Sequence, residues 1–242
     1  MITVNFESIP IKDHDYLLDL GCGEGRHTIT AYCYHNISSI GVDLCFKDLV
    51  IAADRFKSFN QNKKSKNLSF VNSDGLSLPF RDNSFDIIIC SEVLEHIHDY
   101  RGIINEVSRL LVPGGTFVVS VPRAWPEKIC WLLSREYHEV DGGHIRIFNS
   151  KKLKKDIECF GFKCWLRHWA HALHSPYWWL KCLFWKKQNS RIVNLYHKFL
   201  IWDLFRKPFI TRILEKILNP VMGKSVVFYF QKNEFINDIE EN

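Results

Sequence analysis

Short apolar runs alternate with segments of helical periodicity over roughly the first 170 residues of the chain. The runs have the length and the Val, Ile and Phe content of buried strands. We expect strands at 16–20, 37–43, 68–72, 85–90, 115–121, 163–169 and 225–231. Between most of them, apolar residues return every three to four positions, as in helices that bury one face. The alternation predicts an α/β protein with a doubly wound, mostly parallel sheet.

Two of the expected helices have recognisable ends. One covers 100–112 and is ended by Pro113, which cannot continue a helix. For the other, Asn149 or Ser150 can cap the first turn, and Gly161 marks the end. Both helices follow an expected strand, as the doubly wound arrangement requires.

A long segment, 170–223, separates the last two expected strands. Its apolar residues recur at helical spacing, and we interpret it first as a helical cap that packs on the edge of the sheet with its Lys and Arg in water. The chain then divides into a core at 1–169, a basic, Trp-rich helical insertion at 170–223, and a last strand with an acidic tail at 224–242.

Charge and aromatic residues are unevenly distributed in this chain of 242 residues. Residues 151–224 contain 16 Lys and Arg against 4 Asp and Glu, although the net charge of the whole chain is only +5. The same region holds six of the eight tryptophans. Basic and aromatic character together suit a membrane surface or nucleic acid. For the tryptophans we favour core packing first, contact with lipid or an apolar acceptor second, and RNA third.

Alternating glycines join the first expected strand to a helix start in LLDLGCGEGRHT, residues 17–28. Glycines permit a tight turn and a close approach of the backbone to a ligand, and the first turn of the helix offers free N–H groups. A dinucleotide fingerprint needs a third glycine at position 26, where this chain has Arg26. Asp43 ends the next strand, where a carboxylate can accept hydrogen bonds from ribose hydroxyls. These features favour a nucleotide-like cofactor other than a dinucleotide.

Three segments carry a family resemblance. The pattern DxGxGxG, from Asp19 to Gly25, resembles motif I of the class I S-adenosylmethionine-dependent methyltransferases. FDIIICSEVLEHIHD at 85–99 and LVPGGTFVVSVP at 111–122 are similar to the methyltransferase type 11 subgroup, typified by ubiquinone-biosynthesis enzymes. The resemblance covers roughly residues 15–165 and implies a Rossmann-like seven-stranded sheet whose last strand is antiparallel. The simplest members join the last two strands almost directly, so the 170–223 segment is a departure.

The resemblance also implies a site for S-adenosylmethionine. Asp19 would help to place its amino group, Asp74 would read the adenine amino group, and Leu76 would pack on the ring. The backbone of Cys90 and Ser91 would border the sulfonium. The complete expected set is Asp19, Gly21, Cys22, Gly23, Gly25, Asp43, Leu44, Asp74, Gly75, Leu76, Cys90 and Ser91.

Catalytic candidates lie near the expected mouth of the site. Glu92, Glu95 and His96 follow the strand at 85–90 on the substrate side. A general base is needed only if the acceptor must lose a proton. His144, in DGGHIRIF, is the first candidate for this role and His96 is the second.

A further histidine series consists of His168, His171 and His174. Its spacing approximates one helix face, but the expected strand at 163–169 and the interruption at Pro176 do not suit a metal site. We predict no metal and expect these histidines to line an acceptor pocket or an interface.

The predicted function is methyl transfer from S-adenosylmethionine to an apolar or amphiphilic small molecule, such as a lipid, a quinone or a secondary metabolite, which leaves S-adenosylhomocysteine. One alternative is an RNA methyltransferase that uses the basic insertion, although nucleic acid is the less favoured partner. Another is a non-catalytic cofactor-binding module, which the intact glycine loop disfavours.

Location is predicted from what the chain lacks. It shows no signal-peptide pattern at its start, no apolar run of about 18 residues, and no CxxC pair among eight cysteines. We expect reduced thiols and a cytoplasmic protein that contacts the inner membrane surface peripherally.

Overall fold

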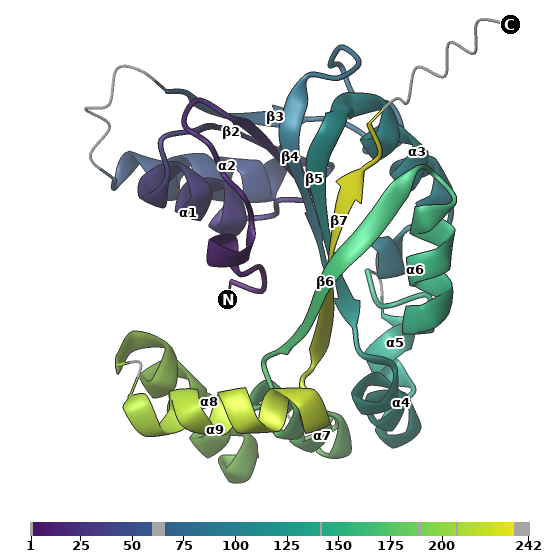
Figure 1. The fold of residues 1–242 in the computed structure, drawn as a ribbon. Coiled ribbons are helices and arrows are strands. Elements are labelled where there is room, and N and C mark those ends of the chain that lie inside the picture. Colours follow the sequence, from purple (N-terminus) through teal and green to yellow (C-terminus); the bar gives the residue numbers. More distant parts are fainter. Residues whose placement is uncertain (1, 60–65, 141, 188–189, 207, 235–242) are drawn as a thin grey trace, which may run out of the picture.

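A seven-stranded sheet forms the centre of the molecule (Figure 1). The computed structural model describes residues 2–59, 66–140, 142–187, 190–206 and 208–234. In chain order the strands are β1 (Tyr16–Leu20), β2 (Ser38–Asp43), β3 (Leu68–Asn72), β4 (Phe85–Ser91), β5 (Leu111–Pro122), β6 (Phe162–Ala170) and β7 (Ser225–Lys232). Their order across the sheet is β3-β2-β1-β4-β5-β7-β6. Only β7 runs antiparallel to its neighbours, so the predicted Rossmann-like sheet is confirmed.

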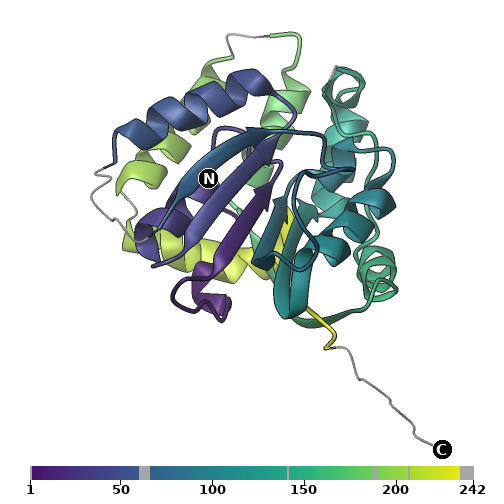
Figure 2. The same cartoon turned by 90° about the horizontal axis from the view of Figure 1, so that it is seen from above.

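Helices cover both faces of the sheet (Figure 2). In Figure 1, α1 (Arg26–Tyr34) and α2 (Phe46–Lys57) lie on one side, and α3 (Tyr100–Leu110) and α6 (Ser150–Glu158) lie on the other. Successive strand residues enter opposite cores: Leu17 packs in the core that includes Ala31 of α1, whereas Leu18 packs in the core that includes Ile104 of α3. Strands buried on both faces explain the continuous apolar runs of the sequence.

The expected helix ends are correct at one helix and displaced at the other. Asn149 caps α6, because its side-chain oxygen accepts hydrogen bonds from the backbone N–H of Lys151 and Lys152. The helix expected to reach residue 112 ends at Leu110, and β5 begins directly at Leu111. A register shift against β4 lets the strand accommodate Pro113 before its regular pairing starts.

Three helices occupy the segment between β6 and β7: α7 (His174–Leu183), α8 (Arg191–Arg206) and α9 (Phe209–Met222). Because they follow β6, they lie at the same edge of the sheet as the carboxyl ends of the other parallel strands (Figure 1). α4 (Ala124–Leu133) and α5 (Glu136–Glu139) follow β5 at this edge, with α4 against α7. Their contact is a cluster of buried Cys130, Tyr137 and Cys182 surrounded by Trp131, Trp178, Trp179 and Trp185.

α9 contacts the edge strand β6, as the interpretation as a cap expects, but α8 and α9 leave much of their apolar surface exposed. Exposed fractions reach 72% at Leu195, 80% at Phe205 and 76% at Phe209, whereas Leu200 is buried. The helices lie near the end of β6, where the backbone N–H of Ala172 donates a hydrogen bond of 2.9 Å to Asn219 Oδ1 of α9 (Figure 1). Among the described residues, no helix combines the length and the apolarity that crossing a bilayer requires.

Candidate active site

The glycine loop after β1 depends on left-handed backbone at three positions. Gly21, Gly23 and Gly25 have φ angles of +72°, +51° and +75°. A Cβ on Gly21 would lie 2.3 Å from Val93 Cγ2, and one on Gly25 would lie 2.9 Å from Ala52 Cβ. A Cβ on Gly23 would meet no atom within 4 Å. The outer glycines are therefore required by packing, while Gly23 presents bare backbone to open space where a ligand can approach.

Asp43, at the end of β2, holds this loop in place. Its Oδ2 accepts a hydrogen bond of 2.7 Å from the backbone N–H of Gly23, and its Oδ1 accepts one of 2.8 Å from Cys45 N–H. A carboxylate oxygen can accept more than one hydrogen bond, so Asp43 retains capacity for hydroxyls of a ligand.

Asp19 does not line the site. It is 1% exposed, and its Oδ2 accepts hydrogen bonds from the backbone N–H and the hydroxyl of Thr28, at 3.0 and 2.6 Å. Burial raises the pKa of Asp19 to about 6, although the bonds from Thr28 oppose the shift. The geometry thus makes Asp19 an anchor between β1 and α1, in place of the contact with the cofactor amino group expected from the sequence. Cys90 is also fully buried and outside the cavity walls.

Two cavities adjoin the glycine loop and share Gly21 and Glu92. The larger has a volume of about 900 Å³ and contains six of the expected cofactor residues, Gly21, Asp43, Leu44, Asp74, Gly75 and Leu76. The smaller, of about 250 Å³, contains Gly21, Cys22, Gly23 and Ser91. The structure therefore brings ten of the expected residues together: nine line the cavities, and Gly25 shapes the loop.

The far end of the larger cavity suits a flat, partly apolar group. Leu44 and Leu76 are 74% and 41% exposed at its wall. Asp74 lies beside them on the surface, where its Oδ1 accepts a hydrogen bond of 3.0 Å from Leu76 N–H. An apolar surface beside a carboxylate fits a heteroaromatic ring that carries an amino group.

The smaller cavity includes residues that the sequence did not suggest. Thr3 and Lys224 were not singled out from the sequence, whereas His27 lies within the segment 17–28 and His171 was expected to line an acceptor pocket or an interface. Lys224 Nζ lies 3.9 Å from Glu92 Oε2. The only sequence signal for Lys224 is its position directly before the last strand, whereas Thr3 gave none.

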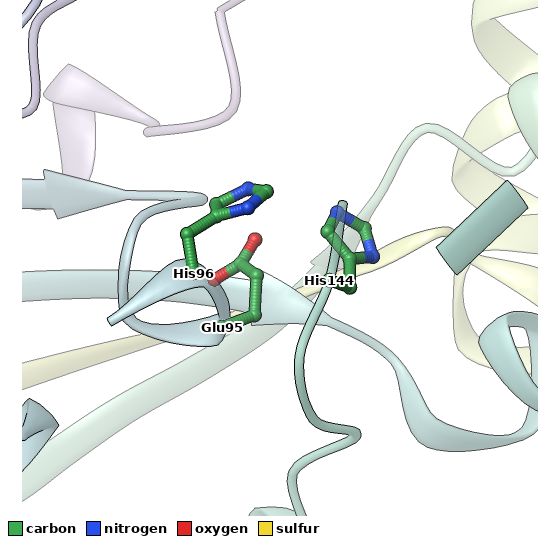
Figure 3. Close-up of side chains that lie close together, drawn as sticks. All are labelled: Glu95, His96 and His144. Atoms are coloured by element: carbon green, nitrogen blue, oxygen red, sulfur yellow. The ribbon is translucent and has the colours of Figure 1, made fainter. Parts of the chain in front are cut away.

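His96 and His144, from two distant segments, lie close together (Figure 3), and His96 lines the larger cavity. The rings of His96 and His144 lie 4.9 Å apart between centroids, edge to face. His144 Nδ1 lies 2.6 Å from Oε1 of Glu127, which is 2% exposed. Burial alone would raise the pKa of Glu127, but the hydrogen bond and charge of His144, with the charge of Lys224, hold it below its usual value. Glu127 is thus an ionised partner that orients the His144 ring.

Glu95 completes this group. Its side chain is fully buried, and among the described residues neither carboxylate oxygen has a hydrogen-bond partner. Burial, reinforced by the negative charge of Glu92, raises the pKa of Glu95 well above its ordinary value. His96 Nδ1 lies 3.2 Å from the carbonyl oxygen of Gly143. Burial, followed by the charge of His144, lowers the pKa of His96.

The His168, His171 and His174 series does not form one site. His168 lies on β6, where its Nε2 is 3.4 Å from the carbonyl oxygen of Thr3. His171 and His174 instead approach Glu215 of α9. Because His168 belongs to β6, as the sequence predicted, it is separated from His171 and His174, which follow the strand.

The strand order with β7 antiparallel, the glycine loop after β1 and the acid after β2 define the S-adenosylmethionine-dependent methyltransferases of class I. Residues 18–119 match the family model described as "Methyltransferase domain", of type 11. Residues 18–119 of the chain thus carry a methyltransferase domain similar to those of type 11.

Similar proteins are also named methyltransferases. The chain is 40% identical over 103 residues to the uncharacterized methyltransferase YcgJ of Bacillus subtilis, covering 43% of this chain and 39% of YcgJ. It is 30% identical over 137 residues to the sterol 24-C-methyltransferase of Kluyveromyces lactis, covering 57% of this chain and 34% of that protein. The chain thus matches less than half the length of either relative. The YcgJ crystal structure superposes with a TM-score of 0.62 at 20% identity, covering 94% of this chain and 96% of that one.

Proposed function

We propose that the protein transfers a methyl group from S-adenosylmethionine to an apolar or amphiphilic small molecule. The observation that carries this proposal is the open face of Gly23 in the smaller cavity, whose backbone N–H is hydrogen-bonded to Asp43 of the larger cavity. The match of residues 18–119 to the methyltransferase family model supports the same activity.

The residues present fit the methyl donor. Gly23 offers backbone without a side chain, Asp43 offers acceptors for two hydroxyls, and Leu76 with Asp74 suits the adenine. In the smaller cavity, Lys224 provides a positive charge for the carboxylate of the methionine part. When bound, S-adenosylmethionine supplies an electrophilic methyl group on sulfur, and S-adenosylhomocysteine remains after the transfer.

The acceptor side lies at His96, which lines the larger cavity next to Val93 and Gly142. Alignment of acceptor and methyl group in a pocket that excludes water supplies much of the acceleration of such a displacement. His96 and His144 each have one ring nitrogen directed to a partner, so each retains a second nitrogen that can serve an acceptor hydroxyl. We retain both as catalytic candidates, with His144 held more firmly.

An apolar acceptor is supported by the surface of α8 and α9. Their exposed apolar side chains include Leu195, Phe205, Phe209 and Ile217, and the same helices carry five basic residues, Arg191, Lys198, Arg206, Arg212 and Lys216. Apolar side chains with surrounding positive charge suit the surface of an anionic bilayer. An enzyme resting there would take its acceptor from the lipid phase.

RNA is the weaker alternative because base stacking needs free aromatic faces. Trp178, Trp179 and Trp185 pack around Tyr137 and Cys182, and Trp179 Nε1–H donates to the carbonyl oxygen of Pro126 at 3.0 Å. These rings are engaged by the fold.

The proposal is tested by supplying donor labelled in the methyl group to purified protein with a lipid extract, a quinone extract or total RNA. We expect label in an organic-soluble product, and none when Asp43→Ala replaces the natural chain. Label in RNA, with steep loss of RNA binding as salt is raised, would establish the alternative instead. Lys57→Ala, which changes an exposed residue of α2, is the matched control.

A further inference from the structure

Three side chains that could bind a metal ion converge beside the methyl-donor cavity. Glu95, His96 and His144 each offer one ligand atom, and these atoms all lie within 4.8 Å of one another. The residues come from two parts of the chain, the turn after β4 and the segment before α6. In the view of Figure 3 the Glu95 carboxylate lies just below the His96 ring, and the His144 ring lies to the right of both.

The hydrogen bonds of the two histidines determine which nitrogens are available. His144 Nδ1 is engaged by Glu127, and His96 Nδ1 by the carbonyl oxygen of Gly143. In both rings the remaining nitrogen is Nε2. Metal-binding histidines regularly donate their other N–H to a carboxylate or to a backbone carbonyl in this way.

The partner of His144 is itself held in position. Trp131 Nε1–H donates to Glu127 Oε1 at 3.1 Å, and Tyr137 O–H donates to its Oε2 at 3.3 Å. Such a supported carboxylate fixes the tautomer of His144 and makes its Nε2 a better ligand. The hydrogen bonds behind the two histidines therefore resemble those that support metal-binding histidines in other proteins.

Glu95 gives independent evidence for a cation site. Its carboxylate is fully buried, and within the described part of the chain neither oxygen has a hydrogen-bond partner. Burying a polar group without a partner is costly, and for a carboxylate the cost is larger still. Lys224, the nearby cation, lies against Glu92, at 3.9 Å. A cation between Glu95 and the two rings would satisfy the orphaned oxygens.

We propose that Glu95, His96 and His144 bind one divalent first-row transition-metal cation, with Zn²⁺ as the representative. Two imidazole nitrogens and one carboxylate oxygen are a ligand set of catalytic zinc sites, whereas Mg²⁺ and Ca²⁺ prefer oxygen alone. Bonds of about 2.0–2.2 Å require the ligand atoms to move together by roughly 1 Å. Three protein ligands leave at least one coordination position open.

The role of this cation rests on the proposed function. His96 belongs to the wall of the larger cavity, so an acceptor hydroxyl there can reach the open position. A bound cation lowers the pKa of a hydroxyl that coordinates it, and the proton leaves to water. The resulting oxygen anion forms the C–O bond while the bond between sulfur and methyl breaks, with its electron pair left on sulfur. His96 and His144 then serve as ligands, and the favoured acceptor carries a hydroxyl.

Metal binding is measured directly, without methyl transfer. The full chain, freed of metal by a chelator, is titrated with Zn²⁺ by calorimetry and with Co²⁺ by visible absorption. We expect one ion per chain, with affinity lowered at least about 100-fold in Glu95→Gln and in His144→Ala, and about 10–100-fold in Glu127→Gln. His98→Ala, which changes an exposed neighbouring histidine, is the control and should bind as the natural chain does.

Other outcomes contradict the site. Absence of a stoichiometric ion would overturn it, as would affinity unchanged in both Glu95→Gln and His144→Ala. Affinity lost in His174→Ala instead would move the ion to the group of His171, His174 and Glu215. Binding of S-adenosylhomocysteine is measured on the same samples. A natural chain that binds it but takes up no metal ion refutes this inference alone, whereas a folded natural chain that binds no S-adenosylhomocysteine refutes the proposed function. Should one variant fail to fold, the other still removes a ligand and tests the same site.

Discussion

The imidazole of His144 donates its Nδ1–H to Oε1 of Glu127 over 2.6 Å, joining the segment before α6 to α4. Glu127 is 2% exposed and ionised, so the His144 ring has one favoured tautomer and one favoured orientation. On the side of the larger cavity where we propose that the acceptor binds, this pair lies behind the wall, since neither residue lines the cavity.

Glu127→Gln tests this relationship. The amide keeps the shape of the side chain but loses the charge that fixes the tautomer of His144, so we expect kcat to fall about 10–100-fold. The dissociation constant of S-adenosylhomocysteine should stay within about twofold, because Glu127 does not line the cofactor cavities. Glu136→Gln, at a more exposed position on α5, is the matched control. Equal loss of kcat in both variants would contradict the positioning role.

His144→Ala should lower turnover much more than cofactor affinity. The imidazole serves the acceptor, as base or as ligand, and such groups contribute about 10²–10⁴-fold to rate. Steady-state kinetics with the true acceptor, beside calorimetry with S-adenosylhomocysteine, separates the two effects. His98→Ala should behave as the natural chain, and unchanged turnover in His144→Ala would remove this residue from the reaction.

Asp19 predicts a dependence of stability on pH. Burial raises its pKa to about 6 in the folded protein from 3.8. Between these values the folded state binds more protons than the unfolded state, so this group makes stability fall as pH rises from about 4 to 6.5. Above that window the loss amounts to about 3 kcal/mol at most.

The matched variant is Asp19→Asn, whose amide oxygen can still accept from Thr28. Denaturant unfolding at pH 4 and pH 7 should show the variant gaining stability relative to the natural chain as pH rises. Parallel pH profiles for the two proteins would mean that Asp19 is not buried as described.

The exposed face of α8 and α9 predicts membrane association. Phe205 is 80% and Leu195 72% exposed, so replacing both by Ser removes apolar surface without opening a core. We expect binding to anionic vesicles to fall at least about tenfold with little change in thermal stability. Tyr34→Ser, at 79% exposure on α1, is the control. Vesicle binding that is absent in the natural chain, or equal in both variants, would refute this use of the helices.

Local patterns along the chain were sufficient to predict the sheet and most of the residues that line the two cavities. Every expected strand is present, because strands buried on both faces leave apolar runs that β-branched residues distinguish from helices. The glycine loop and Asp43 were found because their spacing is set by one strand–turn–helix unit.

Features that depend on tertiary contacts escaped the sequence. Asp19 was assigned to the cofactor because the motif does not reveal that Thr28 takes its carboxylate. Glu127 carried no signal, since its partner lies 17 residues away and the pair forms only when α4 folds back. The apolar periodicity of α8 and α9 correctly indicated helices, but a stripe of this kind looks the same whether it faces a core or solvent.

The central claim is that the glycine loop and Asp43 form a methyl-donor site, and calorimetric titration with S-adenosylhomocysteine tests it most directly. We expect one site per chain, with affinity lowered at least about tenfold in Asp43→Ala, which loses the acceptor for ribose hydroxyls and the brace on Gly23. Asp54→Ala, at an exposed position on α2, should bind as the natural chain does. A folded natural chain that binds no S-adenosylhomocysteine, or an Asp43→Ala variant that binds it undiminished, would contradict the account.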